Sequence, residues 1–338
     1  MEAVHTAGIK MILAIQGALM PALDHPMKFL SYMGEEPFYM AVIPFLFWCV
    51  HRGLGASLLA FLVVNSYINM VFKWVFQGPR PHWYDSNVKG LYLETGYGVP
   101  SGHSQNALGV WVYLAHLLKK LLNQTWFWYV APALAILISF SRLYLGVHFP
   151  HDLVGGWTLA VIVLLVFIYL VPKFTAWFNE QSTGLQIAVS LIGSLVLLGI
   201  ALAVRQSVLG IADPPIWEKN AAVWHPPKPG KTTIDPKNMK NAFSFCGVLA
   251  GLGVGWALML KYANFSEGGP WSQRLGRYVV GMIGLGAAQF GLAAIFPREG
   301  ESLYYLMRFI RYFTVALWAV WLAPWVFLKL KLAAPAAE

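Results

Sequence analysis

Charged residues are scarce in this chain of 338 residues. Asp, Glu, Lys and Arg together make up 12% of it, whereas 58% of the residues are hydrophobic. A soluble globular domain carries about 25% charged residues, so much of this surface has to face lipid. The mean hydropathy of +0.57 agrees with that interpretation. A soluble fold is therefore excluded, and the chain has room for several membrane spans of roughly 20 residues each.

Cysteine is almost absent, since the chain contains only Cys49 and Cys246, both within apolar stretches. A disulfide framework or a thiolate metal site needs several cysteines at characteristic spacings, so neither is expected. We interpret the two thiols as small buried hydrophobic groups. The sequence also lacks low-complexity tracts and any internal repeat of about 20–50 residues, which excludes a solenoid.

A clear signal-peptide cleavage site is also missing. Lys10 precedes an apolar run at 11–23, but no small-residue site follows that run. We therefore expect residues 6–23 to form a short membrane helix or a helix that lies on the membrane surface.

Long apolar segments dominate the rest of the chain, and aromatic residues cluster at many of their edges, as expected at a membrane interface. The fold class that they predict is all-α, a polytopic transmembrane helical bundle. The further predicted spans are 38–50, 54–76, 104–122, 126–145, 153–171, 185–204, 242–260, 278–296 and 306–327. Two longer polar segments, 78–100 and 206–241, interrupt them, and we expect 206–241 to be an extramembrane loop that is ordered in part.

Basic residues exceed acidic ones, 24 against 15, for a net charge of +9. In a membrane protein this balance fits anchoring to anionic headgroups. No basic helix or repeated basic stripe occurs, so nucleic acid is not an expected partner. If the three motifs described below are extracytoplasmic, the opposite side holds mostly short basic connections, which weakly favours that orientation. These contain Arg52, Lys119, Lys120, Lys173, Lys261, Arg274 and Lys329.

The first polar motif is Lys73-x6-Arg80-Pro81, at the end of an apolar segment. Pro79 and Pro81 predict that the helix stops there. Lys73 and Arg80 are seven residues apart, so both can approach one ligand after two helical turns. Lysine supplies a compact charge and arginine a planar fork for phosphate oxygens. The alternative is that both cations extend to the interface without a ligand.

The second motif, Pro100-Ser101-Gly102-His103, predicts a turn followed by a helix start. Ser101 or Ser104 can cap this helix, and Gly102 allows a close approach of the backbone. Free N–H groups at a helix N-terminus attract phosphate, and His103 can protonate a departing alkoxide. An ordinary helix cap with an interfacial histidine is the alternative.

The third motif is Ser141-Arg142-x5-His148-x3-Asp152. Asp152 can hold one ring nitrogen of His148 and leave the other free to attack phosphorus. Arg142 adds a second guanidinium for a phosphoryl transition state. A purely structural His–Asp pair is the alternative. All three alternatives would have to hold together, which is the less economical interpretation for polar groups near membrane depth.

These three patterns resemble those of the type 2 phosphatidic acid phosphatase family, the lipid phosphate phosphatases, which share their site with vanadium haloperoxidases and glucose-6-phosphatase. Every specified position matches, and the resemblance covers about 34–171. It implies His148 as the nucleophile that forms a phosphohistidine, Asp152 as its orienting group and His103 as the general acid. The phosphate oxygens would be held by Lys73, Arg80, Ser101, Gly102 and Arg142. The resemblance implies no metal and no cofactor, and His82 and His151 are interpreted as spectators.

The domain prediction is a six-helix phosphatase core with the active site at 1–175, followed by further transmembrane helices and the extramembrane loop at 176–338. No motif explains the second part, which we interpret as scaffold or as a homodimer contact. The expected substrate is a lipid phosphate or diphosphate reached from the bilayer. The expected location is a bacterial inner membrane with the site extracytoplasmic. A vanadate-dependent haloperoxidase and a non-enzymatic phospholipid carrier or receptor remain as alternatives.

Overall fold

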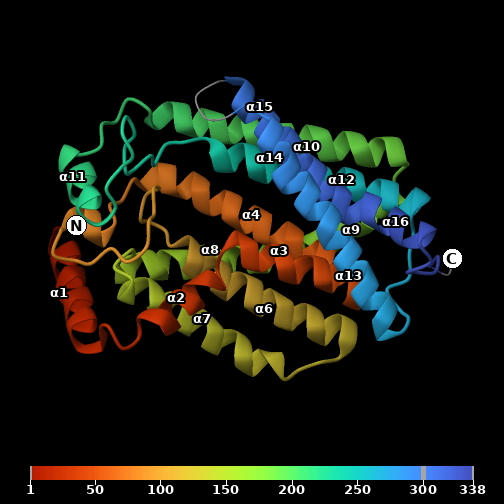
Figure 1. The fold of residues 1–338 in the computed structure, drawn as a ribbon, viewed down its shortest axis with the longest axis horizontal. Coiled ribbons are helices and arrows are strands. Elements are labelled where there is room, and N and C mark those ends of the chain that lie inside the picture. The colour runs from red at the N-terminus through yellow and green to blue at the C-terminus, as the bar shows by residue number, and fades with distance from the viewer. Residues whose placement is uncertain (1, 298–301, 337–338) are drawn as a thin grey trace. The chain divides into compact units, whose positions relative to one another are not determined.

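The computed structural model describes residues 2–297 and 302–336, and its regular secondary structure is helical (Figure 1). Seven helices in the described part are long and apolar enough to cross a membrane. They cover Arg52–Tyr84, Phe127–Tyr144, Pro150–Tyr169, Thr183–Val208, Lys240–Tyr262, Trp271–Ile295 and Leu303–Lys329. The all-α transmembrane fold class is thereby confirmed, and seven of the predicted spans coincide with these helices.

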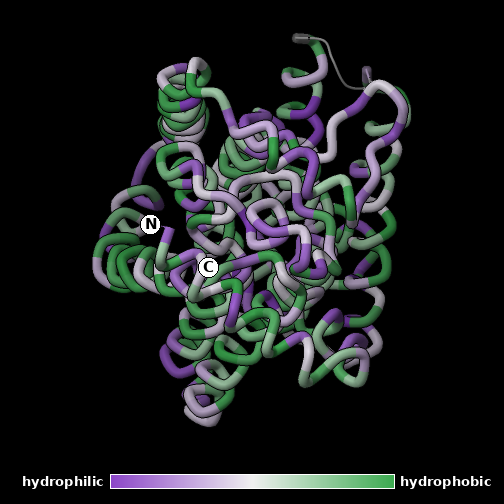
Figure 2. Tube along the Cα trace, turned by 90° about the vertical axis from the view of Figure 1, so that its left-hand side faces the viewer, coloured by the Kyte–Doolittle hydropathy of each residue, from purple (hydrophilic) through white to green (hydrophobic). Residues whose placement is uncertain are grey.

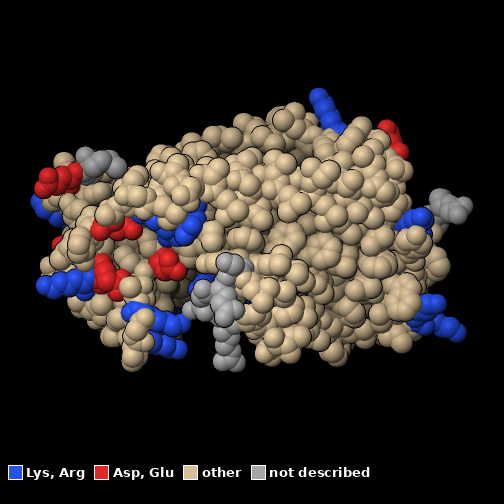
Figure 3. Space-filling view, turned by 90° about the horizontal axis from the view of Figure 1, so that it is seen from above, with Lys and Arg blue, Asp and Glu red and all other residues tan. Residues whose placement is uncertain are grey.

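Green, hydrophobic stretches recur along the tube in Figure 2, and charged side chains are sparse over the middle of the face in Figure 3. Many large apolar side chains of the candidate spans are exposed, including Ile192, Leu195 and Ile283, at 61%, 58% and 69%. In water this exposure would be unfavourable, but in a bilayer the same side chains face acyl chains. The chain is an integral membrane protein.

Three predicted spans differ from these seven helices. The segment 38–50 forms a shorter apolar helix, Glu36–Val50, and 6–23 corresponds to α1 (Glu2–Leu19). The segment 104–122 does form a helix, α6 (Gly102–Leu122), but it does not reach the hydropathy of the seven. The reason is its polar side chains, which include His103, Gln105, Asn106, His116, Lys119 and Lys120.

The chain packs as two compact units that interleave along the sequence. Unit 1 is formed by the described residues of 1–38, 68–164 and 203–238. Its helices are α1, α2 (Asp24–Tyr32), the end of α4 (Arg52–Phe76), α5 (Pro81–Tyr84), α6, α7 (Phe127–Tyr144), most of α8 (Pro150–Tyr169), the end of α10 (Thr183–Val208) and α11 (Pro215–Trp224). All residues of the three motifs belong to this unit.

Unit 2 is formed by the described residues of 39–67, 165–202 and 239–338. Besides parts of α4, α8 and α10 it holds α3 (Glu36–Phe45), η1 (Leu46–Val50), α9 (Val171–Glu180), α12 (Lys240–Tyr262), α13 (Trp271–Gly286), η2 (Ala287–Gly291), α14 (Leu292–Ile295), α15 (Ser302–Leu317), η3 (Trp318–Leu322) and α16 (Ala323–Lys329). Trp48, Phe265 and Phe327 are fully buried in its core. Cys49 and Cys246 are free buried thiols, as predicted.

The prediction of a boundary near 175 stays a prediction. The polar segment 203–238 belongs to unit 1, together with the motifs, although it follows them by more than fifty residues in the chain. The loop at 206–241 is ordered in part as a helix, α11, as expected.

Candidate active site

The loop between α4 and α6 begins where proline ends the first helix. Helix α4 stops at Phe76, and Gln77 adopts a left-handed conformation with φ of 49°. Arg80 precedes Pro81 and is extended, with φ −94° and ψ 156°, because the proline ring disfavours a helical residue before it. The extended backbone at Arg80 separates α4 from the single turn of α5, and residues 85–100 then continue to α6.

The Arg80 guanidinium is 2% exposed and is bonded on every side. Its Nε donates to the Gly96 carbonyl at 2.6 Å, and its Nη1 and Nη2 donate to those of Val147 and Tyr97 at 3.0 and 3.2 Å. Nη1 also lies 3.2 Å from Nε2 of His148. Arg80 is therefore held beside the nitrogen that the sequence predicts to be the nucleophile.

Lys73, in the last turn of α4, shares one of these acceptors. Its Nζ donates to the carbonyl of Tyr97 and to that of Gly98, the latter at 3.2 Å. Lys73 and Arg80 thus approach one group, but that group is a backbone oxygen of the chain. The helical spacing does not bring them together, because α4 ends at Phe76 and Arg80 is extended. Both cations brace the loop that carries Tyr97.

His148 lies in the turn between α7 and α8 and is paired with Asp152, in the first turn of α8, as predicted. Nδ1 of His148 lies 3.2 Å from Oδ2 of Asp152, and this oxygen also accepts the Phe149 N–H at 2.9 Å. Burial, followed by the charges of Arg80 and Lys73, holds the pKa of His148 well below its usual range, so the ring is neutral near pH 7. With the Nδ1 proton directed at Asp152, Nε2 carries the lone pair of the ring, and Nη1 of Arg80 donates to it.

The start of α6 is tied to this turn. The Ser101 N–H donates to the Asp152 carbonyl at 2.9 Å, and the Ser101 hydroxyl caps α6 by accepting the Ser104 N–H at 3.3 Å. The prediction of a cap at this position is confirmed. His103 lies in the first turn, and its Nε2 is buried without a hydrogen-bond partner in the described part of the chain. A phosphate ester is a ligand that this nitrogen could bond.

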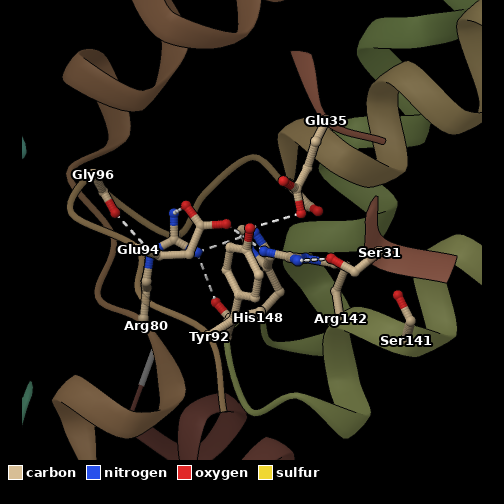
Figure 4. A network of polar contacts seen from close by, with 12 residues as sticks. Ser31, Glu35, Arg80, Tyr92, Glu94, Gly96, Ser141, Arg142 and His148 are labelled. Atoms are coloured by element: carbon tan, nitrogen blue, oxygen red, sulfur yellow. Dashed lines mark hydrogen bonds and ion pairs between the residues drawn. The ribbon is translucent and has the colours of Figure 1, made fainter. Parts of the chain in front are cut away.

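Arg142, at the end of α7, is fully buried and faces a carboxylate that the sequence analysis did not identify. Its Nη2 is bonded to Oε1 of Glu94, whose Oε2 lies 3.2 Å from Nη2 of Arg80 (Figure 4). Nη1 of Arg142 donates to the Ser31 hydroxyl, while its Nε has no partner among the described residues. Glu94 therefore joins the two guanidinium groups and leaves one Arg142 donor for a ligand.

Glu94 is ionised in this position. Burial alone would raise the pKa of Glu94, but the guanidinium groups of Arg80 and Arg142 hold it below its usual range. The only signal for it in the sequence was that it is one of two acidic residues, with Asp85, inside the polar segment 78–100.

The two histidines outside the motifs are placed differently. Nδ1 of His82 lies 3.0 Å from the Gly146 carbonyl, a contact that fastens the loop to the turn after α7. Nε2 of His151 lies 3.2 Å from Oδ1 of Asp152, whereas His148 faces Oδ2. The interpretation of both as spectators stays a prediction.

Six of the eight predicted site residues thus belong to one network of polar contacts within unit 1. These are Lys73, Arg80, Ser101, Arg142, His148 and Asp152. Gly102 and His103 are joined to it as the first residues of the helix that Ser101 caps. Groups of three or more side chains suited to holding a metal ion are absent from the described residues. The arrangement offers a neutral imidazole, an orienting carboxylate and three cations, which is the equipment for transferring a phosphoryl group.

Comparisons with known proteins define the class. A model of the PAP2 superfamily matches residues 54–176, and a model described as "PAP2 superfamily phosphatase, transmembrane extension" matches residues 243–335. The chain belongs to the PAP2 superfamily and is a membrane phosphatase with the transmembrane extension. The helices after 239, for which the sequence analysis had no motif, are accounted for by that extension, whereas 177–242 lies outside both matches.

Among its relatives, glucose-6-phosphatase catalytic subunit 1 of Rattus norvegicus is 25% identical over 311 residues, covering 83% of each chain. Lipid phosphate phosphatase delta of Arabidopsis thaliana is 31% identical over 187 residues, 52% of this chain and 44% of that protein. A solved structure, the PAP2-type phosphatidylglycerolphosphate phosphatase of Bacillus subtilis, is 26% identical with a TM-score of 0.45, covering 51% of this chain and 88% of that one.

Proposed function

We propose that the protein hydrolyses the phosphate ester of a lipid through a phosphohistidine on His148, without a metal. The observation that carries this proposal is the alignment of His148 between Asp152 and Arg80, each 3.2 Å from one ring nitrogen. Such a ring is fixed in one tautomer, and its Nε2 lone pair can attack phosphorus once the phosphate replaces Nε2 as the acceptor of Arg80.

The proposed reaction has two steps. Nε2 of His148 attacks phosphorus, the bond to the ester oxygen breaks, and His103, present as an imidazolium ion paired with the bound phosphate, gives its proton to the departing alkoxide and becomes neutral. Neutral His103 then accepts a proton from water, which attacks the phosphohistidine and releases inorganic phosphate and the histidine. Arg80, Arg142 and Lys73, with Ser101 and the N–H of Gly102, stabilise the negative charge on the phosphoryl oxygens.

A lipid substrate is supported by where the site residues lie in the chain. Lys73 is in the last turn of α4, Arg142 is in the last turn of α7, and Asp152 is in the first turn of α8. Each of these helices belongs to a candidate span. Charged groups at the ends of spans are placed to meet a headgroup whose tail stays among the acyl chains. The similarity to a plant lipid phosphate phosphatase points the same way.

A sugar phosphate is the second candidate substrate. It is favoured by one observation: the glucose-6-phosphatases align with most of the chain, including the extension, whereas the lipid phosphate phosphatase aligns with about half of it. The same site chemistry serves both substrates, since the phosphate is gripped in the same way and only the leaving alcohol differs.

Phosphate release by the purified protein tests the proposal. The panel contains phosphatidate, phosphatidylglycerol phosphate, a sphingoid-base phosphate, undecaprenyl diphosphate and glucose 6-phosphate, with His148→Ala as the matched background. We expect kcat/KM for at least one lipid to exceed that for glucose 6-phosphate by tenfold or more, a difference of about 1.4 kcal/mol. The reverse order would assign the second candidate, and unchanged turnover in His148→Ala would exclude the phosphohistidine route.

The same preparation separates the non-hydrolytic alternatives. A haloperoxidase would oxidise halide after loading with vanadate, and a phospholipid carrier would move labelled lipid across vesicles even in His148→Ala. Neither activity is expected from this chain.

The orientation and assembly are also proposals. We place the site on the extracytoplasmic side of a bacterial inner membrane, with the extension helices as the homodimer contact. A single cysteine introduced at Lys231, an exposed position, should react with a membrane-impermeant maleimide from outside intact spheroplasts. The native Cys49 and Cys246 should add no background, because both are buried. Reaction only after lysis would reverse the orientation, and a monomer mass in detergent would remove the dimer.

A further inference from the structure

The polar segment 209–238 lies between the two regions that match the family models and contains no motif. It is nevertheless built as a defined structure. The Glu218 carboxylate, in α11, accepts the N–H groups of Thr233 and Ile234 at 2.7 and 3.0 Å. The Thr233 hydroxyl donates to the His225 carbonyl at 2.9 Å. These bonds fold the segment back on itself.

One end of this segment holds the beginning of the active-site loop. Asn220 donates to the Trp83 carbonyl at 3.0 Å, and the Trp224 indole donates to the Ser86 carbonyl at 3.1 Å. The rings of Trp217 and Trp83 lie 6.3 Å apart. Trp83 is fully buried and lies 5.7 Å from the Arg80 guanidinium, so this end of the segment reaches the neighbour of a phosphate-binding cation.

The other end holds the second half of the same loop. The Asp235 N–H donates to the Thr95 carbonyl at 3.0 Å, and the Trp74 indole, next to Lys73 in α4, donates to the Pro236 carbonyl at 3.1 Å. Segment 209–238 is thus hydrogen-bonded to the loop 81–98 near both of its ends, although it follows that loop by more than a hundred residues.

Tyr97 links segment 209–238 to the two cations Lys73 and Arg80. Its phenol donates to Oδ1 of Asp213 at 2.8 Å, while its carbonyl accepts from Lys73 and from Arg80. Burial and Asp213 both raise the pKa of Tyr97, so the phenol keeps the proton that it donates. Asp213 is itself held, 3.7 Å from Nζ of Lys237.

We propose that segment 209–238, which we call the outer clamp, positions the active-site loop. Its positioning residue is Asp213, and the positioning residue of the loop is Tyr97, which donates to Asp213. The inference rests on the proposed roles of Lys73 and Arg80. The Asp213–Tyr97 bond holds the residue whose carbonyl accepts from both cations. Phosphoryl transfer depends on such placement, because a displacement of about 1 Å can reduce the rate a hundredfold.

The test uses the full-length protein with Tyr97→Phe, Asp213→Ala and Asp213→Asn. Tyr97→Phe removes one oxygen, and Asp213→Asn keeps an acceptor for the phenol. Tyr129→Phe and Glu180→Gln are the matched controls, because both side chains are exposed. Two quantities are measured: kcat on the best substrate, and the Kd of inorganic vanadate as a probe of the phosphate site.

We expect Tyr97→Phe and Asp213→Ala each to weaken vanadate binding and to lower kcat by about tenfold, with Asp213→Asn restoring part of both. The double variant Tyr97→Phe/Asp213→Ala should have the same kcat and vanadate Kd as each single variant, because each single substitution already removes the Tyr97–Asp213 hydrogen bond. Vanadate affinity and kcat within twofold of wild type in Tyr97→Phe would overturn the clamp.

The vanadate measurement separates this proposal from the proposed function. If His148→Ala retains activity but Tyr97→Phe still weakens vanadate binding, the reaction scheme fails and the clamp stands. If Tyr97→Phe does not fold, Asp213→Ala decides, because it removes the acceptor of the Tyr97 phenol. Vanadate affinity and kcat within twofold of wild type in Asp213→Ala would then refute the clamp.

Discussion

Glu94 and Arg142 form an ion pair in which the arginine is fully buried and the glutamate side chain is 21% exposed. The second oxygen of the same carboxylate is paired with Arg80. Two guanidinium groups on one side of a binding site repel each other unless an anion lies between them. Glu94 is that anion, and it engages the Nη2 atoms only, so that Nε of Arg142 remains without a partner among the described residues.

Glu94→Gln should therefore reduce kcat/KM by tenfold or more, because the uncompensated guanidinium groups move apart and lose their common geometry. Glu94→Asp should retain more activity than Glu94→Gln, since it keeps the charge at a slightly different distance. Steady-state kinetics on purified protein measures both, with Glu180→Gln as the exposed control. A lower KM with unchanged kcat in Glu94→Gln would mean instead that Glu94 competes with the substrate phosphate.

A labelling experiment should distinguish the role of His148 from that of Asp152. The substrate carries radioactive phosphate, and the reaction is stopped without acid. The wild-type protein should then carry a phosphoryl label that is stable in alkali and labile in acid, and His148→Ala should lack it. Asp152→Asn should keep the label site but form it about 100-fold more slowly, since the amide no longer fixes the productive tautomer. Equal labelling of His148→Ala and wild type would place the phosphoryl group on another residue.

The pH dependence of kcat/KM follows from the neutral state of His148. Its pKa is lowered from 6.5, so as the pH falls the ring stays neutral through pH 6.5 and becomes protonated only well below that value. The acid limb due to His148 should therefore lie below pH 6.5. Lys73→Met removes one of the charges that lower this pKa, so its acid limb should move to higher pH. Comparing the two profiles cancels the ionisation of the substrate itself, and an unmoved limb would contradict the assignment.

The sequence predicted those parts of the site that depend on short spacings. The His148–Asp152 pair is four residues apart, and the Ser101 cap acts within α6, so the local backbone places them. Likewise, Pro79 and Pro81 marked the end of the helix that carries Lys73, because their rings cannot continue it.

The missed residues act across long separations. Glu94 meets Arg142 across 48 residues, Ser31 meets Arg142 across 111, and Tyr97 meets Asp213 across 116. A single polar side chain in a loop has no periodicity, and its partner depends on how distant segments pack. The same limit applies to the outer clamp, which was recognisable only as a polar loop, and to α6, whose polar face lowers its hydropathy.

Helix α1 offers a test of how the site loop is supported from the N-terminal side. Gln16 is 5% exposed, and its amide donates to the carbonyls of Lys89 and Tyr144 at 2.9 and 3.0 Å while accepting the Lys89 N–H at 3.0 Å. Gln16→Ala leaves these backbone groups without partners, which should destabilise the protein by about 1–3 kcal/mol. Thermal unfolding in detergent measures the change, with the exposed Gln124→Ala as control. A loss no larger than that of the control would show that water replaces the amide.

The transmembrane extension can be tested where α12 meets α15. A Cβ atom on Gly251 would lie 2.3 Å from the Phe313 carbonyl oxygen, and one on Gly247 would lie 2.5 Å from that of Phe309. Both obstacles are backbone atoms of α15, so the two helices are in contact only because glycine has no side chain there. Gly251→Leu should force the helices apart and lower the stability by about 1–3 kcal/mol or more.

The matched control for this change is Gly199→Leu, in the interior of α10, where an added Cβ meets nothing within 4 Å. Leucine favours a helix more than glycine does, so this variant should unfold at the wild-type temperature or slightly above it. Because α12 and α15 belong to unit 2 whereas the site residues belong to unit 1, Gly251→Leu should also leave KM at moderate temperature closer to wild type than Tyr97→Phe does. Equal melting temperatures for Gly251→Leu and Gly199→Leu would mean that the close approach of the two helices does not stabilise the extension.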